Sequence, residues 1–388
     1  MTRLLALVFL TLALCVPVTI PAEARQTAPA AVEAAVDSFA QTLLDEQQAP
    51  GLSVGIARAG DTLLIRGYGL ANLEHDVPVT GDSVFRIGSV TKQFTAAAIL
   101  LLAEEGALSL DDTLDQYFPD FPRSDEVTIR HLLQHTSGIS NYTSLEGFME
   151  DAAPLDHDSA RMVAYIANAD PLYDFDPGTG WSYSNSGYIL LDYIAEQAAG
   201  VPLADFLKDR IFDPLGLNDT RMDTLAEIVP GRVQGYDSVP DAPSGFTNAG
   251  YLSLSVAAGA GAIRSTPQDM LVWMQALLGG EVVSPDSLAL MLEPARLNDG
   301  SLASGFLVDP HPALAGMDYG FGIMVGERGG RRFIGHGGSI HGFNASLIYY
   351  PDEDTVVVLL VNTIGPAARG APVLAEAVFE ALTASETP

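Results

Sequence analysis

Strand-like patterns lie at both ends of this 388-residue chain, and helical patterns fill the stretch between them. The first strand-like segment alternates apolar and polar residues and turns at Ala59-Gly60-Asp61, as a hairpin does. The strand-like segments are 49–69, 319–338 and 343–363, and helical segments 31–48 and 371–384 flank them. We therefore expect one mainly antiparallel sheet that is built from both ends of the chain and flanked by helices.

The middle of the chain, roughly residues 89–310, is expected to form a helical lobe inserted into this α/β fold. Its helical segments each end near glycine or proline, and they are 89–106, 127–138, 187–200, 202–216 and 266–280. Residues 25–388 are therefore expected to form a single domain.

The N-terminus has the pattern of a secretory signal peptide. Arg3 precedes an apolar run from Leu4 to about Val18, and Ala22-Glu23-Ala24 has the small residues of a cleavage site. We expect residues 1–24 to be removed and the protein to be exported, periplasmic or secreted. No later apolar run reaches about 18 residues, so we expect no stable membrane insertion.

Composition excludes several classes of function. The formal charge of −30 at pH 7 repels nucleic acid, so no nucleic-acid partner is expected. Cys15, the only cysteine, lies in the predicted signal peptide, which removes disulfides and cysteine metal sites. His131 and His135 are four residues apart on a predicted helix but lack the glutamate of a zinc-peptidase motif. We expect no metal and no cofactor.

Lysine occurs only twice in the sequence, and one copy, Lys92, follows Ser89 by three residues at the start of a helix. Residues 96–102 of that helix are all apolar, which is typical of a helix buried on every side. Positions i and i+3 share a helix face, so Lys92 should lie beside the Ser89 hydroxyl. A desolvated lysine can become neutral and accept a proton, whereas arginine cannot. Ser89 is thus a candidate nucleophile.

Two further groups of residues carry chemistry. Tyr183 and Asn185 are two apart in a loop before a helix, so both can face one site. A tyrosine near a cationic lysine can become more acidic and move protons, and an asparagine amide can orient an acyl group. His336-Gly337-Gly338-Ser339 lies on a predicted strand, where glycine allows a substrate to approach and the Ser339 N–H can stabilise an oxyanion.

Taken together, Ser89-x-x-Lys92, Tyr183-x-Asn185 and His336-x-Gly338 resemble the active-site motifs of the serine β-lactamase and penicillin-binding-protein superfamily. The chain is most similar to the class C-like branch of esterases, D-aminopeptidases and D,D-peptidases. This resemblance implies a β-lactamase-like fold. It also implies that Ser89 is acylated, that Lys92 and Tyr183 handle protons, and that Asn185 binds substrate.

The resemblance leaves the substrate open, because His336 stands where β-lactamases have lysine. A mostly neutral histidine should bind a carboxylate less well, unless Arg331 or Arg332 reaches the site.

We expect ester or amide bonds of small acyl compounds, including D-amino-acid peptides, to be cleaved. The alternatives are a β-lactamase or D,D-carboxypeptidase and a non-catalytic sensor with the same fold. An α/β-hydrolase is disfavoured, because Gly337-Gly338-Ser339-Ile340-His341 fails the Gly-x-Ser-x-Gly motif at its last position. The oligomeric state is left open.

Overall fold

A computed structural model describes residues 29–308, 317–365, 367 and 370–386; the predicted signal peptide, 1–24, lies outside them. Within the described residues, eight strands form the main sheet in the order β3-β2-β1-β13-β12-β11-β10-β9. The strands are β1 (Gly51–Arg58), β2 (Asp61–Asn72), β3 (Val77–Pro78), β9 (Met317–Tyr319), β10 (Met324–Arg328), β11 (Arg331–Ile340), β12 (Phe343–Tyr350) and β13 (Thr355–Val361).

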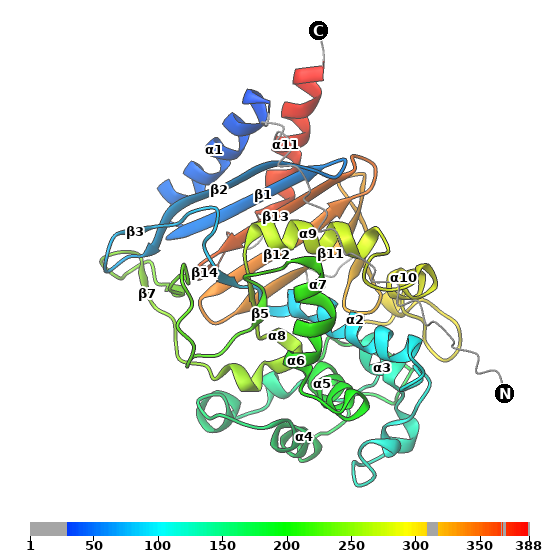
Figure 1. Ribbon diagram of the computed structural model, residues 1–388. Helices are drawn as coiled ribbons and strands as arrows, with labels where there is room; N and C mark the ends of the chain where they lie inside the picture. Colours follow the sequence, from blue (N-terminus) through cyan, green and yellow to red (C-terminus); the bar gives the residue numbers. More distant parts are fainter. Residues whose placement is uncertain (1–28, 309–316, 366, 368–369, 387–388) are drawn as a thin grey trace, which may run out of the picture.

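The sheet joins the two ends of the chain, as the sequence predicts. Strand β1 pairs antiparallel with β13, from Leu52 opposite Val361 to Arg58 opposite Thr355. The hairpin between β1 and β2 turns at residues 59–60. Helices α1 (Ala30–Asp45) and α11 (Ala371–Glu386) lie side by side on one face of the sheet (Figure 1). The predicted mainly antiparallel α/β fold is confirmed.

The central strand β13 shows why its sequence, TVVVLLV, is apolar at nearly every position. Its residues alternate between two hydrophobic cores, because successive side chains of a strand point to opposite faces. Val357 and Leu359 pack toward α1 and α11, whereas Val358 and Leu360 pack toward the helical lobe. A strand covered on both faces has no polar side, so the sheet buries this strand completely.

The helical lobe lies on the other face of the sheet (Figure 1). Its helices are α2 (Thr91–Glu104), α3 (Ile129–Leu133), α4 (Ser159–Ala167), α5 (Asn185–Ala199), α6 (Leu203–Leu207), α7 (Asp213–Leu215), α8 (Ala258–Gly261), α9 (Pro267–Leu278) and α10 (Pro285–Leu292). Six short strands accompany them or join them to the sheet: β4 (Phe85–Arg86), β5 (Arg221–Met222), β6 (Tyr236–Ser238), β7 (Phe246–Asn248), β8 (Ile263–Ser265) and β14 (Thr363–Ile364).

Two predicted helices are shorter than expected. The segment 127–138 is helical only over α3, because Gln134 caps it and His135 has a φ of 61°, which a right-handed helix cannot contain. The segment 202–216 is divided into α6, a π-helical turn at Lys208–Phe212, and α7. No helix in the described part of the chain is long and apolar enough to cross a membrane.

Candidate active site

Ser89 lies in a 3₁₀ turn, Gly88–Val90, that leads directly into α2. Every residue of α2 from Thr91 to Leu100 is buried, so the predicted central buried helix is confirmed. Ser89 itself is only partly buried. Ser89 is therefore accessible from solvent. The helix that follows it is held in place by the hydrophobic core.

Lys92 lies one turn into the same helix and is 0% exposed. Its Nζ lies 3.2 Å from Ser89 Oγ, 2.7 Å from Asn185 Oδ1 and 2.7 Å from the carbonyl oxygen of Ala260. The rings of Tyr183 and Tyr188 have their centroids 4.9 and 5.3 Å from Nζ. Burial lowers the pKa of Lys92 well below its usual value, because the charged form loses its hydration.

A neutral amine, which the lowered pKa favours, can satisfy all three of these contacts. A neutral amine has two N–H donors and one lone pair. Asn185 Oδ1 and the Ala260 carbonyl can only accept, so they take the two N–H groups. The lone pair is then left for the third neighbour, the Ser89 hydroxyl. Lys92 is thus placed to accept the Ser89 proton.

Tyr183 has its hydroxyl buried without a hydrogen-bond partner that meets ordinary geometry. Burial raises the pKa of Tyr183, and the nearby Ser89 hydroxyl offsets this effect only in part. The expectation that Lys92 makes this phenol more acidic is therefore wrong, because burial raises the pKa of Tyr183 by more than the Ser89 hydroxyl lowers it. A neutral Tyr183 can donate a hydrogen bond near Ser89.

Asn185 is the first residue of α5 and follows Ser184 in extended conformation. Its Oδ1 accepts from Lys92, and its backbone N–H donates to Asn141 Oδ1 at 3.1 Å. Its Nδ2 lies 3.3 Å from Asn141 Oδ1 and 3.4 Å from Thr143 Oγ1. Tyr183 and Asn185 do converge on Lys92, and the amide of Asn185 is oriented before any substrate arrives.

Strand β11 passes very close to the turn that carries Ser89. A Cβ on Gly338 would lie 1.9 Å from the Ile87 carbonyl oxygen and 3.1 Å from Ser89 N. A Cβ on Gly88 would lie 2.8 Å from Ser339 N. The backbones of residues 88–89 and 338–339 are therefore adjacent, which places the Ser89 and Ser339 N–H groups near each other as the oxyanion prediction requires.

This close approach gives a paired prediction. Gly338→Ala should displace β11 from the Ser89 turn and lower kcat/KM by at least about tenfold, since small misplacements of reacting groups are costly. Gly337→Ala is the matched control, because its Cβ would meet only the Ala345 carbonyl oxygen at 3.8 Å. The melting temperature should likewise fall more in Gly338→Ala than in Gly337→Ala. Equal losses in both variants would contradict this account of the strand contact.

His336 is 3% exposed and makes two hydrogen bonds. Its Nδ1 donates to the Gly337 carbonyl at 2.5 Å, so its Nε2 accepts from the Tyr319 hydroxyl at 2.9 Å. Burial, with a smaller contribution from Lys92, lowers the pKa of His336 to about 3. The histidine is therefore neutral near pH 7, as predicted, and it offers no positive charge to a carboxylate.

Neither arginine of β11 supplies the missing charge from its observed position. Arg331 forms ion pairs with Glu353 and Glu376, and Arg332 pairs with Asp352 at 2.5 Å. These partners hold both guanidinium groups at the start of β11, whereas Ser339 lies near its end.

Three aromatic residues around the site carry no motif in the sequence: His135, Tyr188 and Tyr319. His135 lies with its ring centroid 4.5 Å from that of Tyr183 and 4.6 Å from that of Tyr319. Tyr188 contacts Lys92 through its ring face. Together these rings exclude water around Lys92. Of the three, the sequence analysis singled out only His135, and it did so for a possible metal pair with His131 rather than for this site.

The histidine pair considered for a metal does not form a ligand set. His131 Nδ1 accepts from the Thr128 N–H at 3.2 Å in a capping box of α3. His135 lies beyond the end of that helix, so the two rings do not share a helix face as the sequence suggested. Among the residues that the structure describes, no group of three or more potential ligands is arranged to hold a metal ion.

Comparisons with known proteins find similarity over most of the chain. The family model described as Beta-lactamase matches residues 36–381. Penicillin-binding protein 4* of Bacillus subtilis (strain 168) is 32% identical over 337 residues, which cover 83% of this chain and 70% of that relative. The D-aminopeptidase of Gluconobacter oxydans (strain 621H) is 28% identical over 333 residues, which cover 85% of this chain but 59% of the relative. The chain therefore spans about three fifths of that D-aminopeptidase.

A solved structure is similar over nearly its whole length. D-amino acid amidase from Ochrobactrum anthropi SV3, complexed with L-phenylalanine amide, superposes with a TM-score of 0.78 at 26% sequence identity. The alignment covers 92% of this chain and 99% of the amidase.

Proposed function

Because the chain belongs to the beta-lactamase family, we propose that this serine hydrolase is exported and cleaves amide or ester bonds of small acyl compounds through an acyl-enzyme on Ser89. The observation that carries the proposal is the buried Lys92 amine, 3.2 Å from Ser89 Oγ in a site that favours its neutral form. The proposal of export rests on the sequence of residues 1–24 alone.

Acylation begins when Ser89 Oγ attacks the substrate carbonyl and Lys92 takes the hydroxyl proton. The carbonyl oxygen becomes an oxyanion, which the N–H groups of Ser89 and Ser339 stabilise. Lys92 then returns a proton to the leaving amine or alcohol, and Tyr183 donates a hydrogen bond near the same atoms. Water attacks the acyl-enzyme in a second step with the same groups. The side-chain amide of Asn185, which Lys92, Asn141 and Thr143 hold in place, binds the acyl group of the substrate.

Two relatives favour amides as substrates, since their names describe a D-aminopeptidase and a D-amino acid amidase. The alignment covers 99% of the amidase, so almost no part of that enzyme is left outside the comparison. We therefore propose D-amino-acid amides and short peptides as the first substrate class, with activated esters also accepted because the same acylation chemistry applies.

β-Lactams and peptidoglycan stems are proposed to be poorer substrates, although one relative is a penicillin-binding protein. Both compounds present a carboxylate, and the neutral His336 cannot form a charge-assisted hydrogen bond to it. The loss of one such bond weakens binding by about 1 to 3 kcal/mol. Uncharged acyl compounds do not need this bond.

The substrate proposal predicts an order of kcat/KM at one pH and salt concentration. D-Alanine p-nitroanilide and p-nitrophenyl acetate should both be hydrolysed, and nitrocefin should be turned over at least about tenfold more slowly, in line with the lost interaction. A clear preference for nitrocefin would contradict the proposal and favour a β-lactamase or D,D-carboxypeptidase.

A further inference from the structure

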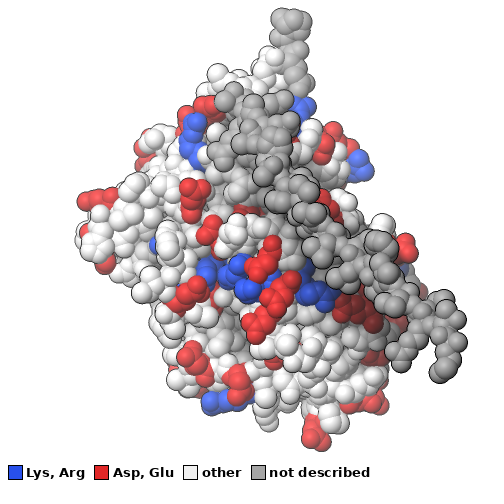
Figure 2. Space-filling model, in the orientation of Figure 1, with Lys and Arg blue, Asp and Glu red and all other residues white. Residues whose placement is uncertain are grey.

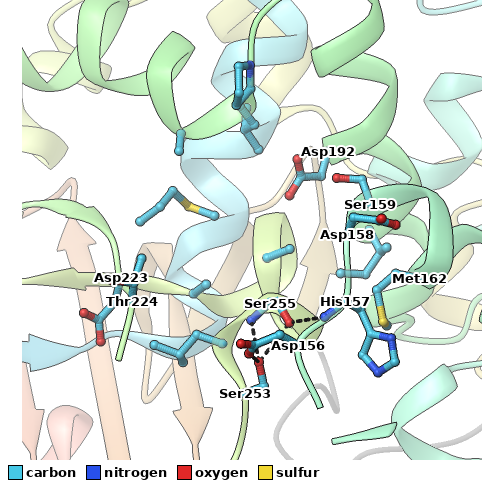
Figure 3. A pocket seen from close by; sticks show the side chains of 18 of the residues that line it. Asp156, His157, Asp158, Ser159, Met162, Asp192, Asp223, Thr224, Ser253 and Ser255 are labelled. Atoms are coloured by element: carbon cyan, nitrogen blue, oxygen red, sulfur yellow. Dashed lines mark hydrogen bonds between the residues drawn. The ribbon is translucent and has the colours of Figure 1, made fainter. Parts of the chain in front are cut away.

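A second cavity, of about 710 Å³, lies in the helical lobe between α4, α5 and the segment that leads into α8 (Figure 3). None of the site residues Ser89, Lys92, Tyr183, Asn185 and Ser339 lines it. The short helix α8 separates the two sites: Ala258 faces the cavity, whereas the carbonyl of Ala260 accepts from Lys92 on the other side. The cavity is therefore distinct from the catalytic cleft.

The charged residues that line this cavity are all acidic. They are Asp156, Asp158, Asp192, Glu196 and Asp223, and none of the described lining residues is lysine or arginine. Basic side chains do occur on the face shown in Figure 2, where several gather in a band across the middle and others lie singly nearer the edges, while acidic ones are spread widely. The acidity of the cavity is thus not balanced by cations on its own wall.

Three of these carboxylates already have partners. Asp223 forms ion pairs with Arg86, Arg232 and Arg264, which line an adjacent pocket rather than this cavity. Asp156 accepts from Ser253 Oγ at 2.5 Å, and Asp158 caps α4 by accepting from the Arg161 N–H. Asp156 and Asp158 are also exposed to water, whereas Asp192 is buried and has one partner, the Gly259 N–H. We therefore take Asp192 and its neighbour Glu196 as the groups available to a ligand.

Asp192 and Glu196 lie one helical turn apart on α5 and share the face that lines the cavity. Asp192 is 5% exposed, and only its Oδ2 has a protein partner in the structure, the Gly259 N–H at 2.7 Å. Burial, with the neighbouring Glu196 second, raises the pKa of Asp192 to about 7. A buried carboxylate beside a second carboxylate is costly without a cation, which a ligand would provide.

The rest of the wall is largely apolar. Met162, Ile189, Leu203 and Leu254 line it, and the rings of Tyr193 and Tyr251 add aromatic surface. A metal ion would not use this surface, and no group of ligands suited to a metal occurs in the described residues. An organic cation would use both the carboxylates and the apolar wall.

We propose that this cavity binds a primary organic ammonium ion with an apolar body, whose ammonium group lies between Asp192 and Glu196. The apolar body contacts the side chains of Met162 and Ile189 on the opposing helices. The proposal does not depend on the reaction at Ser89.

Calorimetric titration of the mature protein with n-hexylammonium chloride at pH 8 tests the proposal. At that pH the amine is protonated and Asp192 is mostly ionised. We expect one bound hexylammonium per chain and no binding of hexanol or hexanoate. Asp192→Asn and Glu196→Gln should each weaken binding at least about tenfold, as loss of a charged partner does. Glu150→Gln, on an exposed turn, should not change it.

Two tryptophan variants locate the bound amine. Ala160→Trp fills the mouth of the cavity from an exposed position on α4 and should abolish binding, whereas Ser339→Trp obstructs the catalytic cleft and should not affect it. Circular dichroism confirms that each variant is folded, and Glu196→Gln decides the outcome if Asp192→Asn is unfolded. Binding that is absent, insensitive to both charge variants, or abolished only by Ser339→Trp would overturn the proposal.

Discussion

Ser89→Ala is expected to lower turnover of p-nitrophenyl acetate by as much as ~10⁶-fold, the scale measured when the nucleophile of another serine hydrolase is removed. The reason is that, among the described residues, the hydroxyl that hydrogen-bonds to the Lys92 amine is Ser89 Oγ, at 3.2 Å, and the Ser89 turn lies beside the backbone N–H of Ser339. The measurement is kcat/KM with purified enzyme, with circular dichroism to show that the fold is retained.

Ser182→Ala is the matched control for Ser89→Ala. Ser182 is partly buried and adjacent to Tyr183, but its known contact is a backbone hydrogen bond to the His135 carbonyl. Its hydroxyl has no role in the proposed reaction, so activity should remain within about twofold, as for most neutral side-chain changes. Comparable losses in both variants would mean that the rate is sensitive to local packing rather than to the nucleophile.

Lys92→Arg is the second substitution with a large expected effect, a loss of at least ~10²-fold in kcat. Arginine keeps a positive charge but cannot release a proton near neutral pH, so it cannot accept the Ser89 proton. Because Lys92 is buried, the larger arginine could destabilise the fold, so the melting temperatures of the variant and the parent must be compared. Lys92→Met is an uncharged variant of similar length. An arginine variant nearly as active as the parent would make Lys92 only an electrostatic neighbour.

The pH dependence separates Lys92 from Tyr183 as the base. Burial lowers the pKa of Lys92, so the neutral, active form appears at lower pH than for an exposed lysine, and kcat/KM should rise as the pH increases through that pKa. Tyr183→Phe should keep this rising limb at the same pH while lowering the rate. Loss of the limb in Tyr183→Phe would instead identify the phenol, whose pKa is raised by burial, as the titrating base.

The sequence predicted the fold well because its signals are local and repeated. The alternating segment 49–69 and the apolar run 355–361 each predict a strand without reference to the strands they pair with. The run 355–361 is apolar throughout because both faces of that strand are buried. The approach of Lys92 to Ser89 was also predictable, since both lie in the first turns of one helix.

The surroundings of Lys92 were not predictable in the same way. His135, Tyr188 and Tyr319 come from three distant segments, and an aromatic residue in a helix or strand usually belongs to the core. The contact between Gly338 and Ile87 depends on how two segments cross, which a single sequence does not encode locally. The error on the acidity of Tyr183 has the same origin, because desolvation depends on packing.

The central claim is that Ser89 forms the covalent acyl-enzyme, and intact-mass spectrometry after treatment with a fluorophosphonate tests it most directly. The account predicts one adduct per chain, located on Ser89 by peptide mapping and absent in Ser89→Ala. A non-catalytic sensor with the same fold would not be labelled. An unchanged mass, or an adduct on another serine, would contradict the account.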